Sequence, residues 1–189
     1  MIKLNPVKKM NNLLTILVFF SVLFSSCSVI KFARYYASAD NSSGGKLSGQ
    51  VYESKDTIYE IGKLSDKWKR INIKGGDLAF WDEAIQATIT ANSTCNIKAN
   101  YSLKALSNSL LIGIRDKQMV EEKEITISGE KALESIYLAK MDNDSVKLCA
   151  VVMKNDTCIY DFTYTSSPDK FDNGFSEFKD FLSQFRVIK

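Results

Sequence analysis

Four consecutive stretches between residues 118 and 165 constrain the fold more than any other part of the sequence. Apolar and polar residues alternate in each of them, which is the period of a β-strand with one buried face. The connections between them are short and rich in Ser, Gly, Asn and Asp, so each strand is expected to pair antiparallel with the next. The predicted strands are 118–127, 132–140, 146–154 and 157–165.

Shorter strand patterns precede this block. They cover residues 67–73, 77–81 and 84–92, with Gly75-Gly76 as a turn signal after the first of them. Together with the later block, they predict an antiparallel sheet of about six to seven strands.

Two amphipathic helices accompany the strands. The first is predicted at 103–114, where four leucines and an isoleucine recur with helical spacing and Ser102 can cap the N-terminus. The second is predicted at 171–185, and its apolar stripe consists of Phe171, Phe175, Phe178, Leu182 and Phe185. Because each helix must bury one apolar face, the predicted fold class is α+β, an antiparallel sheet flanked by two main helices.

The first 27 residues have the features of a secretory signal. Three lysines precede an apolar stretch at 13–24, which is shorter than the roughly 20 residues that a membrane-spanning helix needs. Two serines then lead directly to Cys27. The segment that follows begins with VIKFARYY at 29–36, and from residue 38 to 49 it is rich in Ser, Asn and Gly, a composition typical of a flexible linker.

This pattern resembles a bacterial lipobox, in which the cysteine is acylated and becomes the mature N-terminus. The resemblance implies a signal peptide at 1–26 and lipidation at Cys27. Composition and strand patterns then predict a flexible tether at 27–49 and a single domain at 50–189. In similar lipoproteins a residue such as Ser28 favours transfer to the outer membrane, where the domain would face the periplasm. The alternatives are an ordinary cleaved signal or an uncleaved N-terminal anchor, with Cys27 incidental.

Charge and composition exclude several classes of function. The chain has a formal net charge of +3, and the three lysines before Cys27 account for all of it. The rest of the chain is neutral, which argues against a nucleic-acid partner, since such binding needs clustered positive charge. The chain contains no histidine, so it lacks the commonest general base and the usual zinc ligand. No catalytic residue, metal ligand or cofactor is therefore predicted.

The cysteines that follow Cys27 can form a disulfide in an oxidising envelope compartment. If residues 155–156 form a two-residue hairpin turn, Cys149 faces Phe162 across the hairpin. Cys149 and Cys158 then lie roughly 13 Å apart along the strands. A disulfide needs Cα atoms within about 7 Å, so this pair is excluded.

Two pairings remain, Cys95–Cys158 and Cys95–Cys149. The first is favoured because Cys95 and Cys158 both lie at the ends of predicted strands. Cys149 stands between apolar neighbours and is expected to be a small core residue. Three unpaired thiols are the alternative.

Asp161 is an acidic residue flanked by aromatic residues. It lies between Tyr160 and Phe162 in a predicted strand, and if buried it needs a donor such as Arg70 or Arg115. We expect a paired structural carboxylate. A second acidic group is expected to be a solvated turn, namely Asp77, Asp82 and Glu83.

Several short segments together resemble a family of small bacterial lipoproteins with a PsbP-like α+β sandwich. They are DLAFW at 77–81, ANSTC at 91–95, SLLIGI at 109–114, CIYDF at 158–162 and FSEFKDFLSQF at 175–185. The resemblance implies a domain of the PsbP-like type, whose members mostly bind or stabilise partners and are seldom enzymes. It transfers no active site.

The leading functional hypothesis is a lipid-anchored envelope protein that acts as a non-enzymatic binding or assembly-stabilising module, with an envelope protein as partner. The alternative is a binder of a lipid or other small apolar ligand, serving an envelope transport system. That alternative requires a pocket of several hundred Å³ between the C-terminal helix and the sheet. A third hypothesis is an enzyme that uses carboxylates or a tyrosine.

Overall fold

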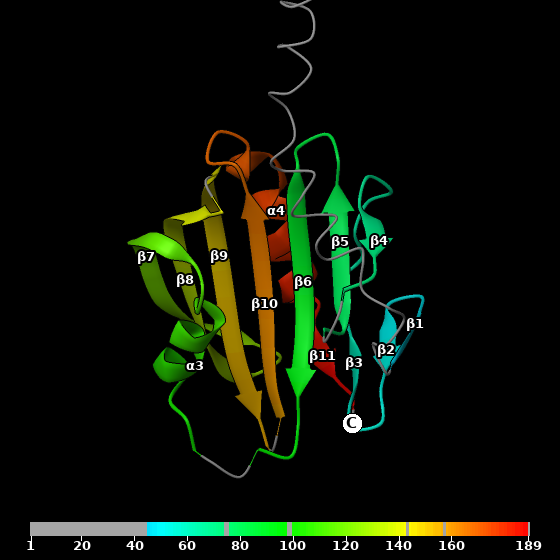
Figure 1. Ribbon diagram of the computed structural model, residues 1–189. Helices are drawn as coiled ribbons and strands as arrows, with labels where there is room; N and C mark the ends of the chain where they lie inside the picture. The colour runs from blue at the N-terminus through cyan, green and yellow to red at the C-terminus, as the bar shows by residue number, and fades with distance from the viewer. Residues whose placement is uncertain (1–44, 74–75, 98–99, 143, 157, 189) are drawn as a thin grey trace, which may run out of the picture.

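The computed structural model describes residues 45–73, 76–97, 100–142, 144–156 and 158–188. The predicted signal peptide, Cys27 and most of the predicted tether lie outside the described residues. Within them the chain forms two antiparallel sheets and two helices (Figure 1). Neither of these two helices is long and apolar enough to cross a membrane.

The larger sheet has seven strands in the order β4-β5-β6-β10-β9-β8-β7, and every neighbouring pair is antiparallel. Its four last strands in sequence are consecutive neighbours, as the alternating pattern predicts. The bounds are Lys69–Ile71 (β4), Leu78–Asp82 (β5), Ala87–Thr94 (β6), Arg115–Ile127 (β7), Glu130–Met141 (β8), Asp144–Asn155 (β9) and Cys158–Ser166 (β10).

The smaller sheet was not predicted. It has the order β1-β2-β3-β11 and combines short strands near the start of the described chain with one at its end. The bounds are Lys46–Ser48 (β1), Val51–Glu53 (β2), Ile58–Glu60 (β3) and Arg186–Val187 (β11). The sheet contributes Tyr52 and Tyr59, both fully buried, to the core of the domain.

Strand β1 corrects the predicted domain boundary. The tether was expected to extend to residue 49 and the domain to begin at residue 50, yet Lys46–Ser48 already pair with Val51–Glu53. Leu47 packs against the core. One apolar side chain in a polar stretch is enough for a short edge strand, and composition alone does not detect it.

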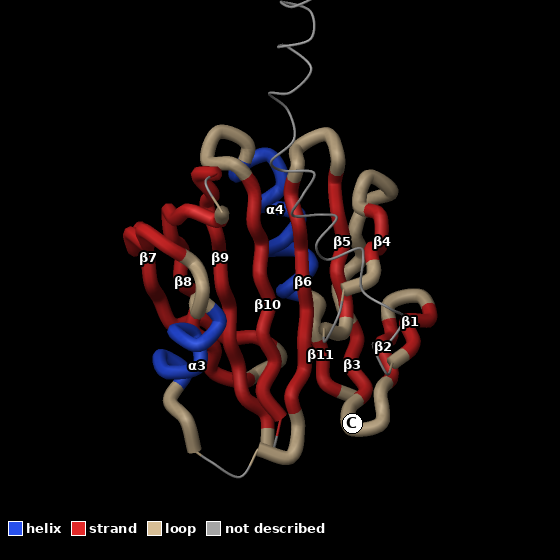
Figure 2. The backbone as a smooth tube through the Cα atoms, viewed as in Figure 1, coloured by secondary structure: helices blue, strands red, loops and turns tan. Residues whose placement is uncertain are grey.

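Helix α4 (Phe171–Ser183) covers one face of the large sheet, and helix α3 (Leu103–Leu110) lies on the other (Figure 2). The predicted fold class, an α+β sandwich with two main helices, is confirmed. The described end of the predicted first helix is at Leu110, where a turn follows and Gly113 has a positive φ of 88°. Ser102 caps α3 as predicted, since its side chain accepts a hydrogen bond from the Ala105 backbone N–H.

The face of the large sheet under α4 is an aromatic core. Phe162 on β10 lies edge-on to Phe181 of α4 and to Phe185, which follows the helix. Tyr164 on the same strand stacks on Phe178 and donates a hydrogen bond to the Phe171 carbonyl oxygen at 2.8 Å. These contacts hold α4 against the centre of the sheet, as the apolar stripe of the sequence predicts.

A buried carboxylate also links α4 to the sheet. Glu134 on β8 faces the α4 side and is only 1% exposed. Its side chain forms ion pairs with Lys179 of α4 and, at 3.1 Å, with Lys123 of β7. A charge this deeply buried is tolerable because both cations compensate it.

The hairpin between β9 and β10 has a different register from the predicted one. Cys158 faces Asn155, and Cys149 faces Tyr164 where Phe162 was expected. The turn is displaced because Asp156, with a φ of 48°, takes the left-handed conformation, whereas Asn155 belongs to the strand. Cys149 and Cys158 are therefore even farther apart along the hairpin.

The favoured disulfide, Cys95–Cys158, is present. Cys95 follows β6 and Cys158 begins β10, so the bond joins neighbouring strands at one end of the sheet. Cys149 is free and fully buried, which confirms its interpretation as a core residue. Burial raises the pKa of its thiol, which keeps the thiol protonated and unreactive.

We expect the double substitution Cys95→Ala/Cys158→Ala to lower the free energy of unfolding by about 4 kcal/mol, because the bond closes a loop of 63 residues. Urea unfolding of the purified protein with and without reductant measures this. The variant Cys149→Ala is the control, since it leaves the disulfide intact and keeps its sensitivity to reductant. Equal stability of the oxidised and reduced wild-type protein would contradict the prediction.

Candidate functional site

The face of the large sheet that carries α3 contains an open groove, here called the α3-side groove. It consists of two hollows that share Thr88, Met141 and Thr165, and they enclose about 540 and 740 Å³ of open space, including the solvent at their mouths. Its floor is formed by β6 and β10. The other lining residues are Ile73, Trp81, Gln86, Thr90, Asn92, Leu110, Ile114, Asp142, Asp144, Ser145, Val146, Leu148, Asp161, Thr163, Ser166 and Ser167.

The floor of the groove is a ladder of polar side chains from two antiparallel strands. The cross-strand pairs are Thr88 with Thr165, Thr90 with Thr163, and Asn92 with Asp161. The hydroxyls of Thr90 and Thr163 are 2.7 Å apart and hydrogen-bonded, and the Asn92 amide donates to the Asp161 carboxylate at 2.8 Å. The strands impose this arrangement, because every second side chain of a strand points to the same face.

Asp161 does not have the partner that the sequence suggested. Its donor is Asn92, and neither Arg70 nor Arg115 is among the groups that shift its pKa. Burial raises that pKa to about 6, partly offset by the hydrogen bond from Asn92, and the nearby Asp77 carboxylate adds to the increase. The side chain therefore changes charge close to neutral pH.

Asp77 also differs from its prediction, which was a solvated turn. Its carboxylate accepts hydrogen bonds from the hydroxyls of Tyr52, Tyr59 and Ser93, so it joins the small sheet to the large one. Its backbone N–H donates to the Asn92 side-chain oxygen at 3.1 Å, which fixes the orientation of the Asn92 amide. The groove floor is thus supported from below by a hydrogen-bond network.

Asp82, from the same predicted cluster, is buried as well. It is 4% exposed, and its carboxylate accepts a hydrogen bond from the Ala84 backbone N–H at 2.9 Å in the turn before β6. Of the three acidic residues only Glu83 is exposed, as expected. The prediction failed because sequence shows the acidic residues but not the hydroxyls and N–H groups that face them.

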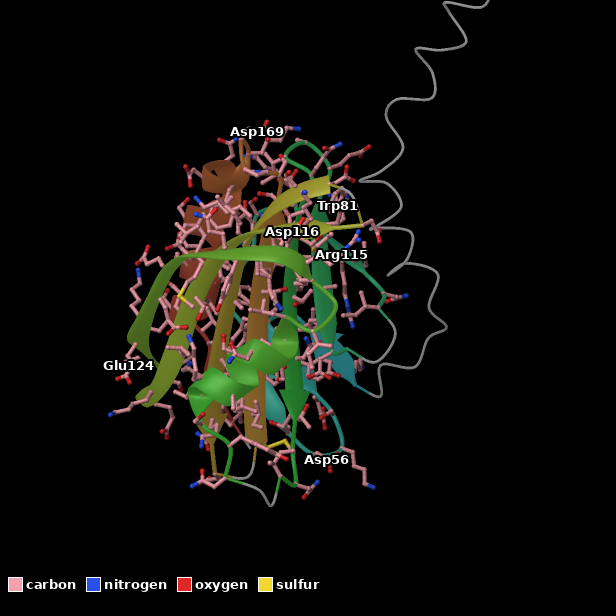
Figure 3. The ribbon with its side chains drawn as sticks, turned by 60° about the vertical axis from the view of Figure 1, so that its left-hand side comes forward. Asp56, Trp81, Arg115, Asp116, Glu124 and Asp169 are labelled. Carbon is pink, nitrogen blue, oxygen red and sulfur yellow. A yellow bond between two sulfur atoms is a disulfide. The ribbon has the colours of Figure 1, made fainter. Side chains whose placement is uncertain are left out.

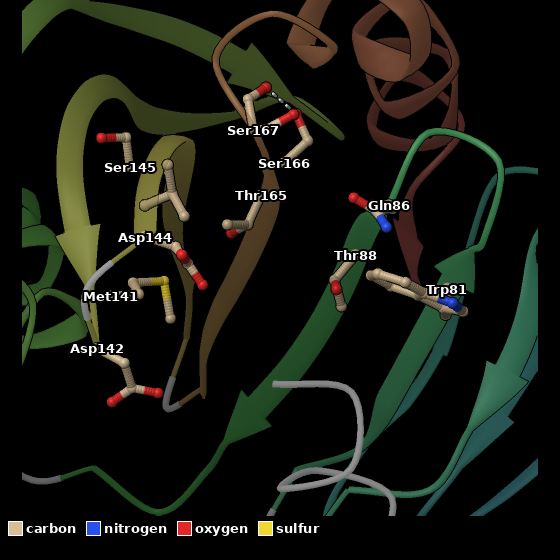
Figure 4. A pocket seen from close by; sticks show the side chains of 11 residues that line it. Trp81, Gln86, Thr88, Met141, Asp142, Asp144, Ser145, Thr165, Ser166 and Ser167 are labelled. Atoms are coloured by element: carbon tan, nitrogen blue, oxygen red, sulfur yellow. Dashed lines mark hydrogen bonds between the residues drawn. The ribbon is translucent and has the colours of Figure 1, made fainter. Parts of the chain in front are cut away.

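The walls of the groove are apolar along the hollow that contains Thr90 and Asn92. Leu110, at the end of α3, and Ile114 form the wall on the α3 side. Met141, the last residue of β8, and Leu148 on β9 extend it, and Ile73 lies on the opposite rim. Figure 4 shows the end of the groove where Thr88 and Thr165 lie between Trp81 on one side and Met141 on the other.

The charges around the groove are negative. Asp142 and Asp144 line one end and Asp161 lies on the floor, while no Lys or Arg is among the described residues that line either hollow. Arg115 is close by, and its guanidinium donates to the Asp142 backbone carbonyl oxygen. Figure 3 shows Trp81 and Arg115 at the end of the sheet opposite to Asp56.

The groove presents two kinds of chemical group to a ligand, polar ones on its floor and apolar ones on its walls. Within the described residues no group of His, Cys, Asp or Glu side chains is placed to hold a metal ion. On the floor the hydroxyls of Thr90 and Thr163 bond to each other, and the Asp161 carboxylate accepts a hydrogen bond from the Asn92 amide. The groove can offer hydrogen-bond donors and acceptors on its floor and apolar contacts on its walls.

The α4 side of the sheet has a different character. Phe171, Phe178, Phe181 and Phe185 are each no more than 1% exposed and pack against β6, β9 and β10. Gly174 of α4 lies so close to the Tyr164 hydroxyl that an added Cβ would be 2.8 Å from it. The space in which a small apolar ligand was expected is therefore filled by side chains.

Two of the predicted site residues, Cys95 and Cys158, are brought together, but the disulfide lies beyond the groove and supports the ends of its two floor strands. Cys27 lies outside the described residues. The groove itself was not predicted from the sequence. The available signal was the repeated threonine at alternate positions of two strands, at 88 and 90 and again at 163 and 165.

Comparison with known proteins defines the fold. The chain is similar to the solution structure of cyanobacterial PsbP (CyanoP) from Synechocystis sp. PCC 6803, with a TM-score of 0.55 and 18% identity, over 76% of this chain and 98% of that one. It is also similar to the crystal structure of LpqN, described as involved in cell envelope biogenesis of Mycobacterium tuberculosis, with a TM-score of 0.55 and 10% identity. That match covers 69% of this chain and 84% of LpqN.

The class defined by these matches is the PsbP-like α+β sandwich, which confirms the fold that the sequence resemblance implied. A further similar structure comes from Bacteroides thetaiotaomicron VPI-5482, with a TM-score of 0.51, 9% identity and coverage of 69% of this chain and 45% of the other. No protein-family model and no curated protein matches the chain. At these identities the similarity establishes the fold alone.

The raised pKa of Asp161 makes stability depend on pH. The native state binds this proton more tightly than the unfolded chain, so the aspartate is stabilising when protonated and costs stability as the pH rises from about 4 through 6. We expect Asp161→Asn to raise the free energy of unfolding at pH 7 by roughly 1–3 kcal/mol. The side-chain oxygen of the new asparagine can still accept the hydrogen bond from the Asn92 amide.

Urea unfolding at pH 4, 5.5 and 7 measures the effect, and the advantage of the variant should shrink toward pH 4. The control Asp66→Asn removes a negative charge at an exposed position. An advantage of Asp161→Asn that is the same at all three pH values would show that burial of this carboxylate is not its origin.

Proposed function

We propose that this protein is a lipid-anchored bacterial envelope protein whose domain acts as a non-enzymatic binding or assembly-stabilising module. In this proposal Cys27 carries the lipid, the anchor lies in the outer membrane, and the domain faces the periplasm, where it meets an envelope partner, expected to be a protein. The signal pattern before Cys27 supports the anchor. The description of LpqN, a protein of similar fold, as involved in cell envelope biogenesis is compatible with the setting.

The observation that carries the binding role is the α3-side groove. It is open, it is built on two central strands of the large sheet, and its polar floor is held in place by cross-strand hydrogen bonds. A site on rigid strands needs little ordering when a partner binds, which favours recognition. The absence of histidine from the sequence and the buried, protonated Cys149 support a role without catalysis.

The alternative, a carrier of a lipid or other small apolar ligand, has less support. Its expected pocket lies under α4, where phenylalanine side chains fill the space. An acyl chain in the α3-side groove would instead cover the hydroxyls of Thr90 and Thr163 and the Asp161 carboxylate without bonding to them. Burying such groups without new partners is costly.

The anchor makes a direct prediction. We expect the wild-type protein to sediment with membranes and Cys27→Ala to appear in the soluble periplasmic fraction, because the variant has no thiol to acylate at that position. Cell fractionation and the intact mass of the purified protein measure this, with Cys149→Ala as the matched cysteine control. Membrane association of Cys27→Ala at the wild-type level, with an unchanged mass, would overturn the lipid anchor.

The groove makes a second prediction. We expect an envelope component to be cross-linked to the full-length protein in its own host cells, and to be lost from the double variant Thr90→Val/Thr163→Val. This change removes two mutually bonded hydroxyls in favour of methyl groups of the same shape, so the fold should be little affected. The control Thr94→Val changes an exposed position of the same strand outside the groove lining.

Thermal unfolding of each variant checks that the fold is intact. A component that is recovered equally with the double variant and with the wild-type protein would place the binding surface elsewhere and contradict the proposal for the groove.

A further inference from the structure

The chemistry of the α3-side groove restricts what can bind there. A hydroxyl can donate one hydrogen bond and accept others, so in the Thr90–Thr163 pair one hydroxyl proton remains available for a ligand. The floor presents a pair of polar side chains at every second residue from Thr88 to Asn92. At the rise of a β-strand this ladder is roughly 13 Å long. An elongated ligand with regularly spaced polar groups matches this floor.

The charge of the groove excludes anionic ligands. Asp142, Asp144 and Asp161 line it, and the described lining residues include no Lys or Arg to pair with a phosphate or carboxylate. Carboxylates accept strong hydrogen bonds from hydroxyl donors. The ligand that fits is therefore not anionic, and it supplies O–H or N–H groups.

The walls add an apolar requirement. Leu110 and Ile114 on the α3 side face the floor, and Trp81 lies at the other end of the groove. An aromatic ring of this kind offers a large apolar contact surface to a ligand that is polar elsewhere. The ligand must carry apolar C–H surface as well as polar groups.

We propose that the α3-side groove binds a neutral saccharide chain. Sugar rings combine hydroxyls around their edges with C–H groups on their faces, so one chain can satisfy the floor and the walls together. This inference rests on the function proposed above and refines it, because the part of the envelope partner that enters the groove is then a glycan in place of a protein segment.

Other occupants fit less well. An acyl chain would leave the floor unbonded. An extended peptide would satisfy its backbone best at an open sheet edge, such as β7, where N–H and C=O groups lie in a row, whereas the groove lies over the middle of the sheet. A cationic peptide could pair with the carboxylates, and the experiment includes it.

The test is a titration of the purified full-length protein in a detergent without a sugar head group. The probes are chitotetraose, cellotetraose and maltotetraose as neutral saccharides, tetragalacturonate as an anionic one, tetralysine as a cationic peptide, and palmitate. Calorimetry gives the affinity. Tryptophan fluorescence reports the site, because the chain has only two tryptophans and Trp68 is buried in the core.

We expect at least one neutral tetrasaccharide to bind and to change the Trp81 emission, and the anionic saccharide, tetralysine and palmitate not to bind in the groove. The double variant Thr90→Val/Thr163→Val should bind the saccharide at least ~10-fold more weakly, since two hydrogen bonds are lost. Thr94→Val should bind like the wild-type protein, and Trp81→Phe should lose the fluorescence change.

Absence of binding by all three neutral saccharides at millimolar concentration, or binding that the double variant retains, would overturn the saccharide proposal. Binding of tetralysine or palmitate that the double variant loses would replace it with that ligand class. If no saccharide binds but the cross-linked envelope component still depends on Thr90 and Thr163, the groove remains the binding surface and only the ligand class is wrong.

Discussion

The packing of α4 against the large sheet is the contact on which the rest of the structure depends. Its phenylalanines occupy the face of β10 that carries Phe162 and Tyr164, and the aromatic cluster continues into the small sheet through Phe185 and Tyr59. Burial of this much aromatic surface supplies the main stabilisation of a domain of this size. It also fills the space between α4 and the central strands of the sheet, so this part of the face is unavailable for a ligand.

Strand β10 shows how the same residues produce both the core and the groove. Its even-numbered residues Tyr160, Phe162 and Tyr164 are buried on the α4 side of the sheet. Its odd-numbered residues Asp161, Thr163 and Thr165 form part of the groove floor. The alternation of side chains along the strand thus couples the core to the groove floor. A shift of the strand register by one residue would exchange the two sets of side chains. The disulfide and the Thr90–Thr163 hydrogen bond fix β10 against β6. The groove floor is therefore as rigid as the core on the other face of the same strands.

The sequence predicted the features that follow from periodicity. The antiparallel block, the phenylalanine stripe of the C-terminal helix, the Ser102 cap and the Cys95–Cys158 pair are all present. Periodicity does not specify register, however, and Asp156 displaced the last turn by adopting a positive φ that Asn155 could equally have taken. The small sheet was not predicted because strands of two or three residues are too short to show an alternating pattern.

The hydrogen-bond partners of the acidic residues could not be predicted either, because they are far away in the sequence. Asp161 bonds to Asn92, which is 69 positions away, and Asp77 bonds to two tyrosines of the other sheet. Such contacts depend on tertiary placement, and the groove floor is made of them. Threonines at alternate positions of two strands were visible in the sequence, but only the strand pairing shows that they face each other.

The most direct test of the central claim, that the protein meets its partner on the α3 side of the sheet, is site-specific photocross-linking in the host cell. A benzophenone amino acid is placed at Ser145, an exposed residue at the groove, or at Ser176, an exposed residue of α4. We expect a cross-linked envelope component from position 145 and none from position 176. A product from position 176 alone would contradict it, and would place recognition on the helix that the structure assigns to the core.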